Sequence, residues 1–494
     1  MLAWTVYISF LGVAVLMLLD PAHKRAARMI GLVTALVGFV IALAGTLQYQ
    51  AGSGVLTICR VPWIPSLGIA YHLAADGISL TLVILTGIAA VAGILFSWNV
   101  EHRVKEFFAF YLALIGGVYG VFLSFDLLLL FVFYELAIIP KYFLIAIWGS
   151  TNKEYGAMKL ALYSFVGSAM VLIGLVAAFV VAGANTMSLF ELAKYPFPES
   201  FQYWAFPLVF VGFAVLAGLW PFHTWAPTGH VAAPTAASML LAGVVMKLGA
   251  YGALRVAMTL FPLGLKAWQN EVGLLAVIGI IYGAMVALVQ KDFKFVIGYS
   301  SVSHMGFVLL GLVTLNEIGL SGAVLQMFSH GIIAGLLFGV VGRMVYDRTH
   351  TRELAVLQGM SLSSAIPFAA VTFAIASVAS MGLPGFSGFV AELQVLIGAW
   401  HAFPTLAVLA GFGILVGVAY TLRALQQAFF SEHVPAVEPR THPLEAISIP
   451  ERFGAVILIG TSLLIGLYPR LLLDLIVPSF SSPLFEGLRK GGLF

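Results

Sequence analysis

The sequence has few charged residues, a single cysteine and no evident nucleotide-binding loop. Only 9% of its 494 residues are charged, whereas 61% are hydrophobic, and soluble proteins average about 25% charged residues. This composition excludes an ordinary soluble protein and predicts a chain that lies in a lipid bilayer. Most of the surface should face acyl chains, so the formal net charge of +3 indicates little about partners, and we expect no nucleic acid among them.

The scarcity of cysteine also restricts the chemistry. Cys59 alone cannot form an internal disulfide, an iron–sulfur cluster or a structural zinc site. Neither a Gly-x-x-x-x-Gly-Lys-[Ser/Thr] loop nor a dinucleotide fingerprint is present. No His or Glu has the spacing that places two metal ligands on one helical face. We therefore expect no cofactor, no metal and no redox centre in this chain.

Long apolar runs dominate the remainder of the sequence. A spanning helix needs about 20 mostly apolar residues, and this criterion predicts an all-α polytopic membrane protein with about fourteen transmembrane helices. No connecting segment is long enough for a soluble domain, so residues 1–494 form one domain. The predicted spans are 2–19, 29–48, 77–98, 107–123, 125–149, 157–183, 204–225, 234–260, 272–290, 294–315, 318–346, 364–397, 404–430 and 453–474.

Basic residues fall mainly in the loops that follow odd-numbered spans. Because short cytoplasmic loops are enriched in Lys and Arg, both termini are predicted to face away from the cytoplasm. Arg60, Lys194 and Lys266 are the main basic residues in the other loops. The residues on the predicted cytoplasmic side are Lys24, Arg25, Arg28, Arg103, Lys105, Lys153, Lys291, Lys294, Arg343, Arg348, Arg352, Arg440 and Arg452.

Two spans contain helix-breaking segments, at 218–227 (GLWPFHTWAP) and 382–389 (GLPGFSGF). A broken helix is tolerated in a membrane where protein or a wet cavity surrounds it. The breaks lie in spans seven and twelve, five spans apart, which predicts two inverted five-helix repeats, spans 4–8 (107–260) and 9–13 (272–430). Residues 1–106 hold spans one to three, and 453–494 hold the last span and tail. Ordinary packing kinks are the alternative.

Four ionisable residues stand out inside predicted spans: Glu135, Lys141, Lys247 and Glu392. Each costs about 2.5–3.5 kcal/mol on insertion scales, so each is a candidate for an ion path. Carboxylates and ammonium groups placed near each other can take and release protons near neutral pH. The alternatives are static buried ion pairs and, for Lys141, an ammonium that reaches the cytoplasmic interface.

Two histidines, His304 and His330, lie inside spans ten and eleven. An unperturbed imidazole titrates near pH 6.5, so they could link a proton route between Lys247 and Glu392, although a membrane histidine is often only a packing residue. Two other histidines, His223 and His230, are expected near an interface. Asp76 and Asp126 lie at predicted span ends, where we expect them to cap helix N-termini.

Five stretches together carry a family resemblance: FVFYELAIIPKYFLIAIWG (131–149), WPFHTWAPTGHVAAPTAASMLLAGVVMKLGAYGALR (220–255), KDFKFVIGYSSVSHMGFVLLGL (291–312), YDRTHTREL (346–354) and GLPGFSGFVAEL (382–393). They resemble the antiporter-like subunits in the membrane arm of proton-pumping NADH:quinone oxidoreductase, respiratory complex I. The run RTHTREL and the glutamate at 392 favour the branch of chain M, the mitochondrial subunit 4 type. The agreement extends from about Asp76 to Pro469.

The resemblance implies a fourteen-helix fold with two inverted repeats and a hydrated row of charges along the mid-plane. By motif, Glu135 matches the family's glutamate of helix five and Lys247 the lysine of helix eight. His304 and His330 match the axis histidines, and Glu392 matches the exit-side residue. It also implies other membrane-arm subunits as partners, including sibling antiporter-like chains, with lipids and protons, in a bacterial-type inner membrane.

The chain departs from the family pattern at three positions. The lysine that the family carries five residues before the proline of the PFHxW motif is Leu216, and Lys141 stands where the family has an apolar residue. We hypothesise that Lys141 replaces that lysine as the partner of Glu135. Their separation of six residues gives about 9 Å along a helix and about 120° around it, which is poor for direct contact. Thr228 replaces the Asp of the family's LPDAH segment.

Four functions are consistent with these features. The first is a proton-translocating subunit of a complex I-like NADH:quinone oxidoreductase, which catalyses no covalent reaction on its own. The alternatives are a subunit of a multisubunit sodium/proton antiporter, a subunit of an energy-converting hydrogenase membrane arm, and a structural spacer that no longer pumps. The RTHTREL run weighs against the antiporter, whereas Leu216 leaves the spacer open.

Overall fold

The fold is a bundle of long helices in a computed structural model that describes residues 1–183, 185–431 and 444–490. Arg440 lies outside these ranges. Over residues 1–260, the helices are α1 (Ala3–Leu18), α2 (Lys24–Gln48), η1 (Pro65–Leu67), α3 (Gly77–Phe96), α4 (Val104–Leu123), α5 (Leu127–Trp148), α6 (Lys153–Ala182), α7 (Leu189–Leu192), α8 (Glu199–Ala217), α9 (Trp225–Ala232), α10 (Thr235–Leu240), η2 (Leu241–Val245), α11 (Met246–Gly252) and η3 (Ala253–Met258).

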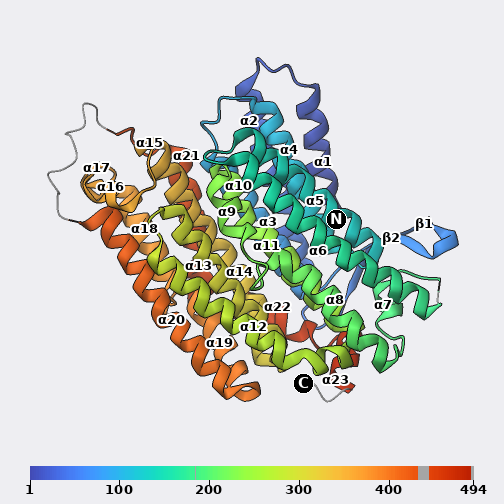
Figure 1. Cartoon of the computed structure of the whole chain (residues 1–494). Helices are drawn as coiled ribbons and strands as arrows, with labels where there is room; N and C mark the ends of the chain where they lie inside the picture. Colours follow the sequence, from blue (N-terminus) through green and yellow to red (C-terminus); the bar gives the residue numbers. More distant parts are fainter. Residues whose placement is uncertain (184, 432–443, 491–494) are drawn as a thin grey trace.

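The second half of the chain continues the same bundle (Figure 1). Its helices are α12 (Pro262–Val289), α13 (Phe293–Val313), α14 (Glu317–Gly339), η4 (Val340–Tyr346), α15 (Asp347–Thr349), α16 (Leu354–Gln358), α17 (Leu362–Ala365), α18 (Pro367–Ser380), α19 (Ser387–Ala402), α20 (Pro404–Leu425), η5 (Gln426–Phe430), α21 (Ile449–Leu467), α22 (Arg470–Ser479), η6 (Pro483–Phe485) and α23 (Glu486–Lys490).

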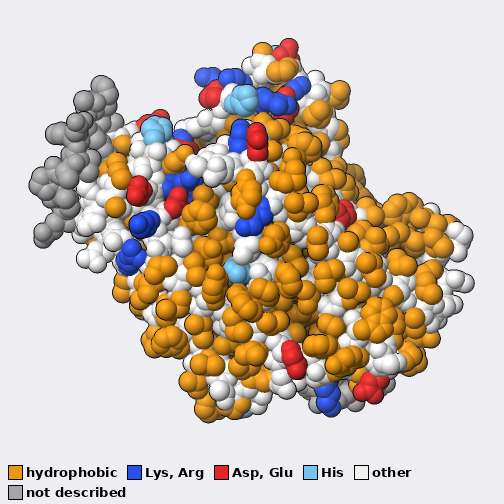
Figure 2. Space-filling model, viewed as in Figure 1, with side chains coloured by type: hydrophobic (Ala, Val, Ile, Leu, Met, Phe, Trp, Pro, Cys, Tyr) orange, Lys and Arg blue, Asp and Glu red, His pale blue; other side chains and the backbone are white. Residues whose placement is uncertain are grey.

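The predicted all-α membrane fold is confirmed. Over the described ranges, twelve helices are long and apolar enough to span a membrane. The two predicted spans outside that set are α1, which has 16 residues, and the pair α18 and α19, which the second break divides. Figure 2 shows hydrophobic side chains over most of the visible face, with most Lys and Arg in its upper half. The chain is therefore an integral, multi-pass membrane protein.

Both predicted helix breaks are present. The helix α8 ends at Ala217, and Gly218 follows with a φ of 87°, a conformation that glycine adopts without a steric penalty. The second break lies between α18 and α19, where Gly382 and Gly385 have φ values of 73° and 104°. Pro227 and the residues around it fold into the short helix α9. The second break divides its span into the two short helices α18 and α19, whereas at the first break α8 keeps 19 residues and the short helix α9 follows it.

A β-hairpin between α2 and α3 was not predicted. Strands β1 (Leu56–Ile64) and β2 (Ile69–Ala75) pair antiparallel, with Leu56 opposite Ala75. Strand β2 is attached to the bundle, because the Phe125 amide donates to the His72 carbonyl (3.0 Å) and the Ala70 amide donates to Asp126 Oδ2 (3.0 Å). Asp126 therefore holds the hairpin in addition to capping α5, its predicted role.

The predicted cytoplasmic loops converge at one end of the bundle. Arg352, in the loop after α15, lies 3.2 Å from Asp292 Oδ2 before α13. Its Nη2 donates to Thr151 Oγ1 before α6 (3.1 Å). Three loops that follow odd-numbered predicted spans are thus held together by one guanidinium group, which places them on the same side of the membrane.

Candidate proton-translocation site

Lys247 lies on α11, in the middle of the bundle, with none of its surface exposed. Two π-helical turns, η2 and η3, flank α11, and such turns often occur at functional positions. The Lys247 ammonium donates to the Ala242 carbonyl within η2 and contacts His330 Nδ1 at 2.7 Å. Lys247 is therefore bonded directly to one of the two predicted relay histidines.

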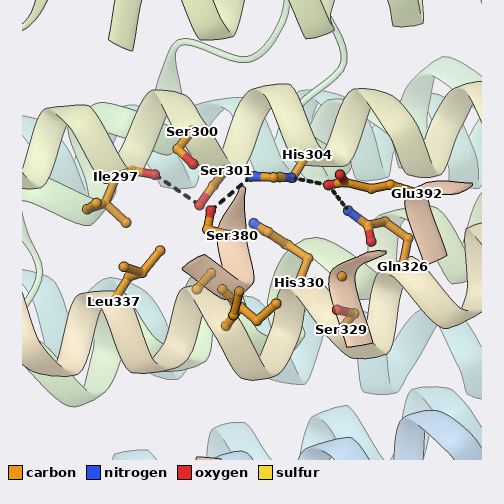
Figure 3. A pocket seen from close by; sticks show the side chains of 14 residues that line it. Ile297, Ser300, Ser301, His304, Gln326, Ser329, His330, Leu337, Ser380 and Glu392 are labelled. Carbon is orange, nitrogen blue, oxygen red and sulfur yellow. Dashed lines mark hydrogen bonds and ion pairs between the residues drawn. The ribbon is translucent and has the colours of Figure 1, made fainter. Parts of the chain in front are cut away.

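The two histidines continue the row from α14 to α13. The ring centroids of His330 and His304 are 5.5 Å apart, and His330 Nε2 has no hydrogen-bond partner among the described residues. His304 Nδ1 lies 2.8 Å from Glu392 Oε1, and its Nε2 lies 3.2 Å from Ser380 Oγ (Figure 3). The imidazoles therefore bridge the space between Lys247 and Glu392, as the sequence predicted.

Glu392 ends the row on α19, just after the second helix break. Its carboxylate accepts hydrogen bonds from His304 and from Gln326 Nε2, the latter at 3.2 Å. A Cβ at Gly382 would lie 3.1 Å from Glu392 Oε2, so the glycine of the break leaves room for this carboxylate. The broken helix and the acidic group are thus parts of one arrangement.

A small cavity follows the second half of the row (Figure 3). The volume that the centre of a water molecule can reach is about 10 Å³, close to the minimum that a single buried water needs. The cavity is therefore at the lower size limit for one water molecule, and the histidines and hydroxyl groups around it are polar. Its polar lining residues are Ser300, Ser301, His304, Gln326, Ser329, His330, Ser380 and Glu392.

The predicted pair on α5 is arranged differently from that row. Lys141 is completely buried and donates to Ser164 Oγ on α6 at 3.2 Å, so its ammonium does not reach the membrane interface. Glu135 is half-buried, and its Oε1 has no hydrogen-bond partner in the described part of the chain. Within that part the two side chains form no direct ion pair, although they interact electrostatically. Leu216, on α8, is 1% exposed.

His223 lies outside the row, whereas His230 lies beside it and interacts electrostatically with Lys247 and His330. Both are buried, and none of their ring nitrogens has a hydrogen-bond partner among the described residues. His230 stacks on Phe338 with the ring centroids 4.6 Å apart. His230 is thus buried in the interior beside the row, more enclosed than its expected place near an interface.

Sequence reasoning missed several polar residues of the interior. Arg255, on η3, forms two 2.7 Å hydrogen bonds with Asp76, and neither side chain is exposed. Asp76 also caps α3 as predicted, by accepting from the Ser79 amide at 2.9 Å. The signal for Arg255 was available, because it lies in the same apolar span as Lys247 and carries the same insertion cost. Gln326 and Ser380 are uncharged and give no comparable signal.

A buried row of titratable side chains inside a bundle of spanning helices is typical of polytopic membrane proteins that translocate ions. Residues 124–417 match the family model described as the transmembrane region of NADH:quinone oxidoreductase and Mrp antiporters. The chain belongs to this family.

Two relatives and one solved structure cover nearly the whole chain. The chain is 37% identical to NADH-quinone oxidoreductase subunit M of Rhodobacter capsulatus over 93% of its length and 90% of the relative's. It is 35% identical to the subunit of the same name from Escherichia coli, with 96% of each chain covered. A chain of respiratory complex I from Thermus thermophilus with bound NADH superimposes with a TM-score of 0.88 at 29% identity, over 98% of this chain and 100% of that one.

Proposed function

We propose that this chain is the M-type, proton-translocating subunit in the membrane arm of a complex I-like NADH:quinone oxidoreductase. The observation that carries the proposal is the continuous contact series from Lys247 through His330 and His304 to Glu392. Each member can gain or lose a proton, and each is close enough to change the proton affinity of the next. Energy from quinone reduction elsewhere would move protons along this series.

The location and partners belong to the same proposal. The chain would lie in a bacterial-type inner membrane with both termini away from the cytoplasm, beside sibling antiporter-like subunits. Electrons would pass through other subunits, because this chain contributes the proton path alone. The loops joined by Arg352 support the orientation. The names of the chain's relatives support the partner subunits.

The exchange of Glu392 for glutamine tests the proposal. Glutamine keeps the shape and the hydrogen bonds to His304 and Gln326 but cannot carry a proton. We expect NADH-driven acidification of inside-out membrane vesicles to fall by about 100-fold, the lower end of the effect of removing a proton-transfer group. Glu317→Gln, at the exposed start of α14, is the control and should pump normally. Equal rates in both variants would contradict the proposal.

A multisubunit sodium/proton antiporter is the second candidate, because the description of the matching family includes Mrp antiporters. Purification of the intact assembly separates the two. A complex I-like assembly should contain NADH-oxidising subunits and should acidify vesicles on addition of NADH without added sodium. Transport that depends on a sodium gradient and ignores NADH would favour the antiporter.

A further inference from the structure

Lys141 has an unusual environment for a buried cation. Its ammonium has three donors, yet its one hydrogen bond to the described residues goes to a neutral acceptor, Ser164 Oγ. No carboxylate in the described part of the chain lies within ion-pair distance of it. A static role as a packing ion pair would require such a partner. An intramembrane cation without one is a candidate for a group that exchanges protons.

A column of polar contacts on α6 leads towards this lysine. Lys159 Nζ lies 3.3 Å from Thr228 Oγ1, and Tyr163 OH lies 2.9 Å from Thr224 Oγ1. Both pairs join α6 to the α9 region, and their four-residue spacing places them one turn apart on the same face. His223 adjoins Thr224 with two buried ring nitrogens that lack hydrogen-bond partners among the described residues. The column starts nearly two turns inside the basic, predicted cytoplasmic end of α6, because Lys159 is six residues after Lys153.

The column continues from α6 to α5. Ser164 follows Tyr163 directly in the chain and accepts from Lys141. Ser168, one turn further along α6, is 4% exposed and lies near Glu135, with which its side chain interacts. Glu135 Oε1 has no hydrogen-bond partner in the described part of the chain. Polar groups thus occur on successive turns of α6 from Lys159 to Ser168. Tyr163 and Ser164 project about 100° apart around the helix, so a transfer between them needs an intervening water.

From this geometry we propose that Lys141 is the proton carrier of the first repeat, supplied by the α6 and α9 column and delivering to Glu135. The column consists of Lys159, Tyr163, Ser164, Thr224 and Thr228. In the transfer an N–H bond of the Lys141 ammonium breaks and an O–H bond forms on Glu135, by way of the α6 hydroxyls. Because residue 216 is leucine, α8 has no cation at the position where the family carries its lysine. The proposal rests on the proposed proton-translocating function and specifies its uptake path.

The Lys141→Arg variant tests the carrier role. Arginine keeps a positive charge but does not release its proton in a protein. A carrier would therefore be lost, whereas a fixed structural charge would be preserved. We expect NADH-driven acidification of inside-out vesicles by the assembled complex to fall by about 100-fold. Lys141→His, which retains a titratable nitrogen, should restore part of the transport.

The column is tested by Tyr163→Phe combined with Thr228→Val, which removes two hydroxyl groups with little change in volume. We expect slower acidification, most marked at high external pH, where protons are scarce. Lys153→Met, at the first residue of the same helix, removes a cation outside the column and serves as the control. If Lys141→Arg does not assemble, the neutral Lys141→Gln takes its place and should also lose transport.

Measurement of Lys247→Met in parallel separates the two proposals. Normal transport in Lys247→Met would overturn the proposed function itself. Loss of transport in Lys247→Met together with parental transport in Lys141→Arg or Lys141→Gln would overturn only the carrier role of Lys141. Parental transport in the Tyr163→Phe and Thr228→Val double variant, at every pH, would overturn the uptake path.

Discussion

Replacing Lys247 by methionine is expected to abolish proton transport by the assembled complex. Methionine is similar in length and fills the same space on α11, but it has no proton and no charge. The substitution removes the contact to His330 (2.7 Å) and the charge that would push a proton along the row. Because the missing group is the central one, we expect acidification to fall by about 1,000-fold, within the range for removing a proton-transfer group.

The matched control is Lys105→Met. Lys105 lies near the start of α4, half-buried, where its ammonium donates to the Leu19 carbonyl at 2.9 Å. Both variants lose one lysine, but only one of them touches the row. Vesicle acidification should be measured with NADH oxidation and with the amount of assembled complex. Acidification by Lys247→Met at the rate of Lys105→Met would contradict a central role for Lys247.

Asp76→Ala is expected to destabilise the folded chain by about 3–5 kcal/mol, the range for breaking a buried ion pair. Arg255 would keep its charge inside the bundle without the two 2.7 Å bonds to Asp76, and α3 would lose its N-cap. Asp76→Asn keeps the cap and one acceptor, so its effect should be smaller. The measurement is thermal or chemical unfolding of the detergent-solubilised protein.

Glu191→Ala provides the comparison. Glu191 pairs with Arg60 at 3.5 Å, and more than half of each side chain is exposed. Exposed pairs contribute at most about 1 kcal/mol, so the unfolding transition should barely move. If Asp76→Ala and Glu191→Ala lowered stability equally, the buried pair between α3 and η3 would not be a major source of stability.

The sequence was a good guide where a physical cost applies to the residue type alone. Lys247 and Glu392 could be selected because a charge is costly in any apolar span, and the structure joins them through His330 and His304. The helix breaks were also accessible, because proline and glycine act on the backbone locally. The inverted relation of the two repeats remains a prediction.

Side-chain contacts between helices could not be predicted from the sequence, because they depend on the direction in which side chains point in the assembled bundle. Lys141 was placed on the correct helix, but its contact with Ser164 instead of Glu135 depends on how α5 and α6 pack. Gln326 was passed over because an uncharged amide is much less costly to bury than a charge. The β-hairpin was missed because a strand needs no long apolar run, so the criterion for spanning helices gives no signal over residues 56–75.

The two π-helical turns around Lys247 alter the register of its helix. A π turn closes its hydrogen bond one residue later than an α turn, so each turn takes up one additional residue, and one residue advances an α-helix by about 100°. A helical wheel drawn through 235–258 would therefore assign Lys247 to the wrong azimuth relative to both ends of the span. The alignment of Lys247 with His330 depends on an extra residue stored in η2, so a single-residue deletion there would turn the ammonium away while leaving every member of the row in the sequence.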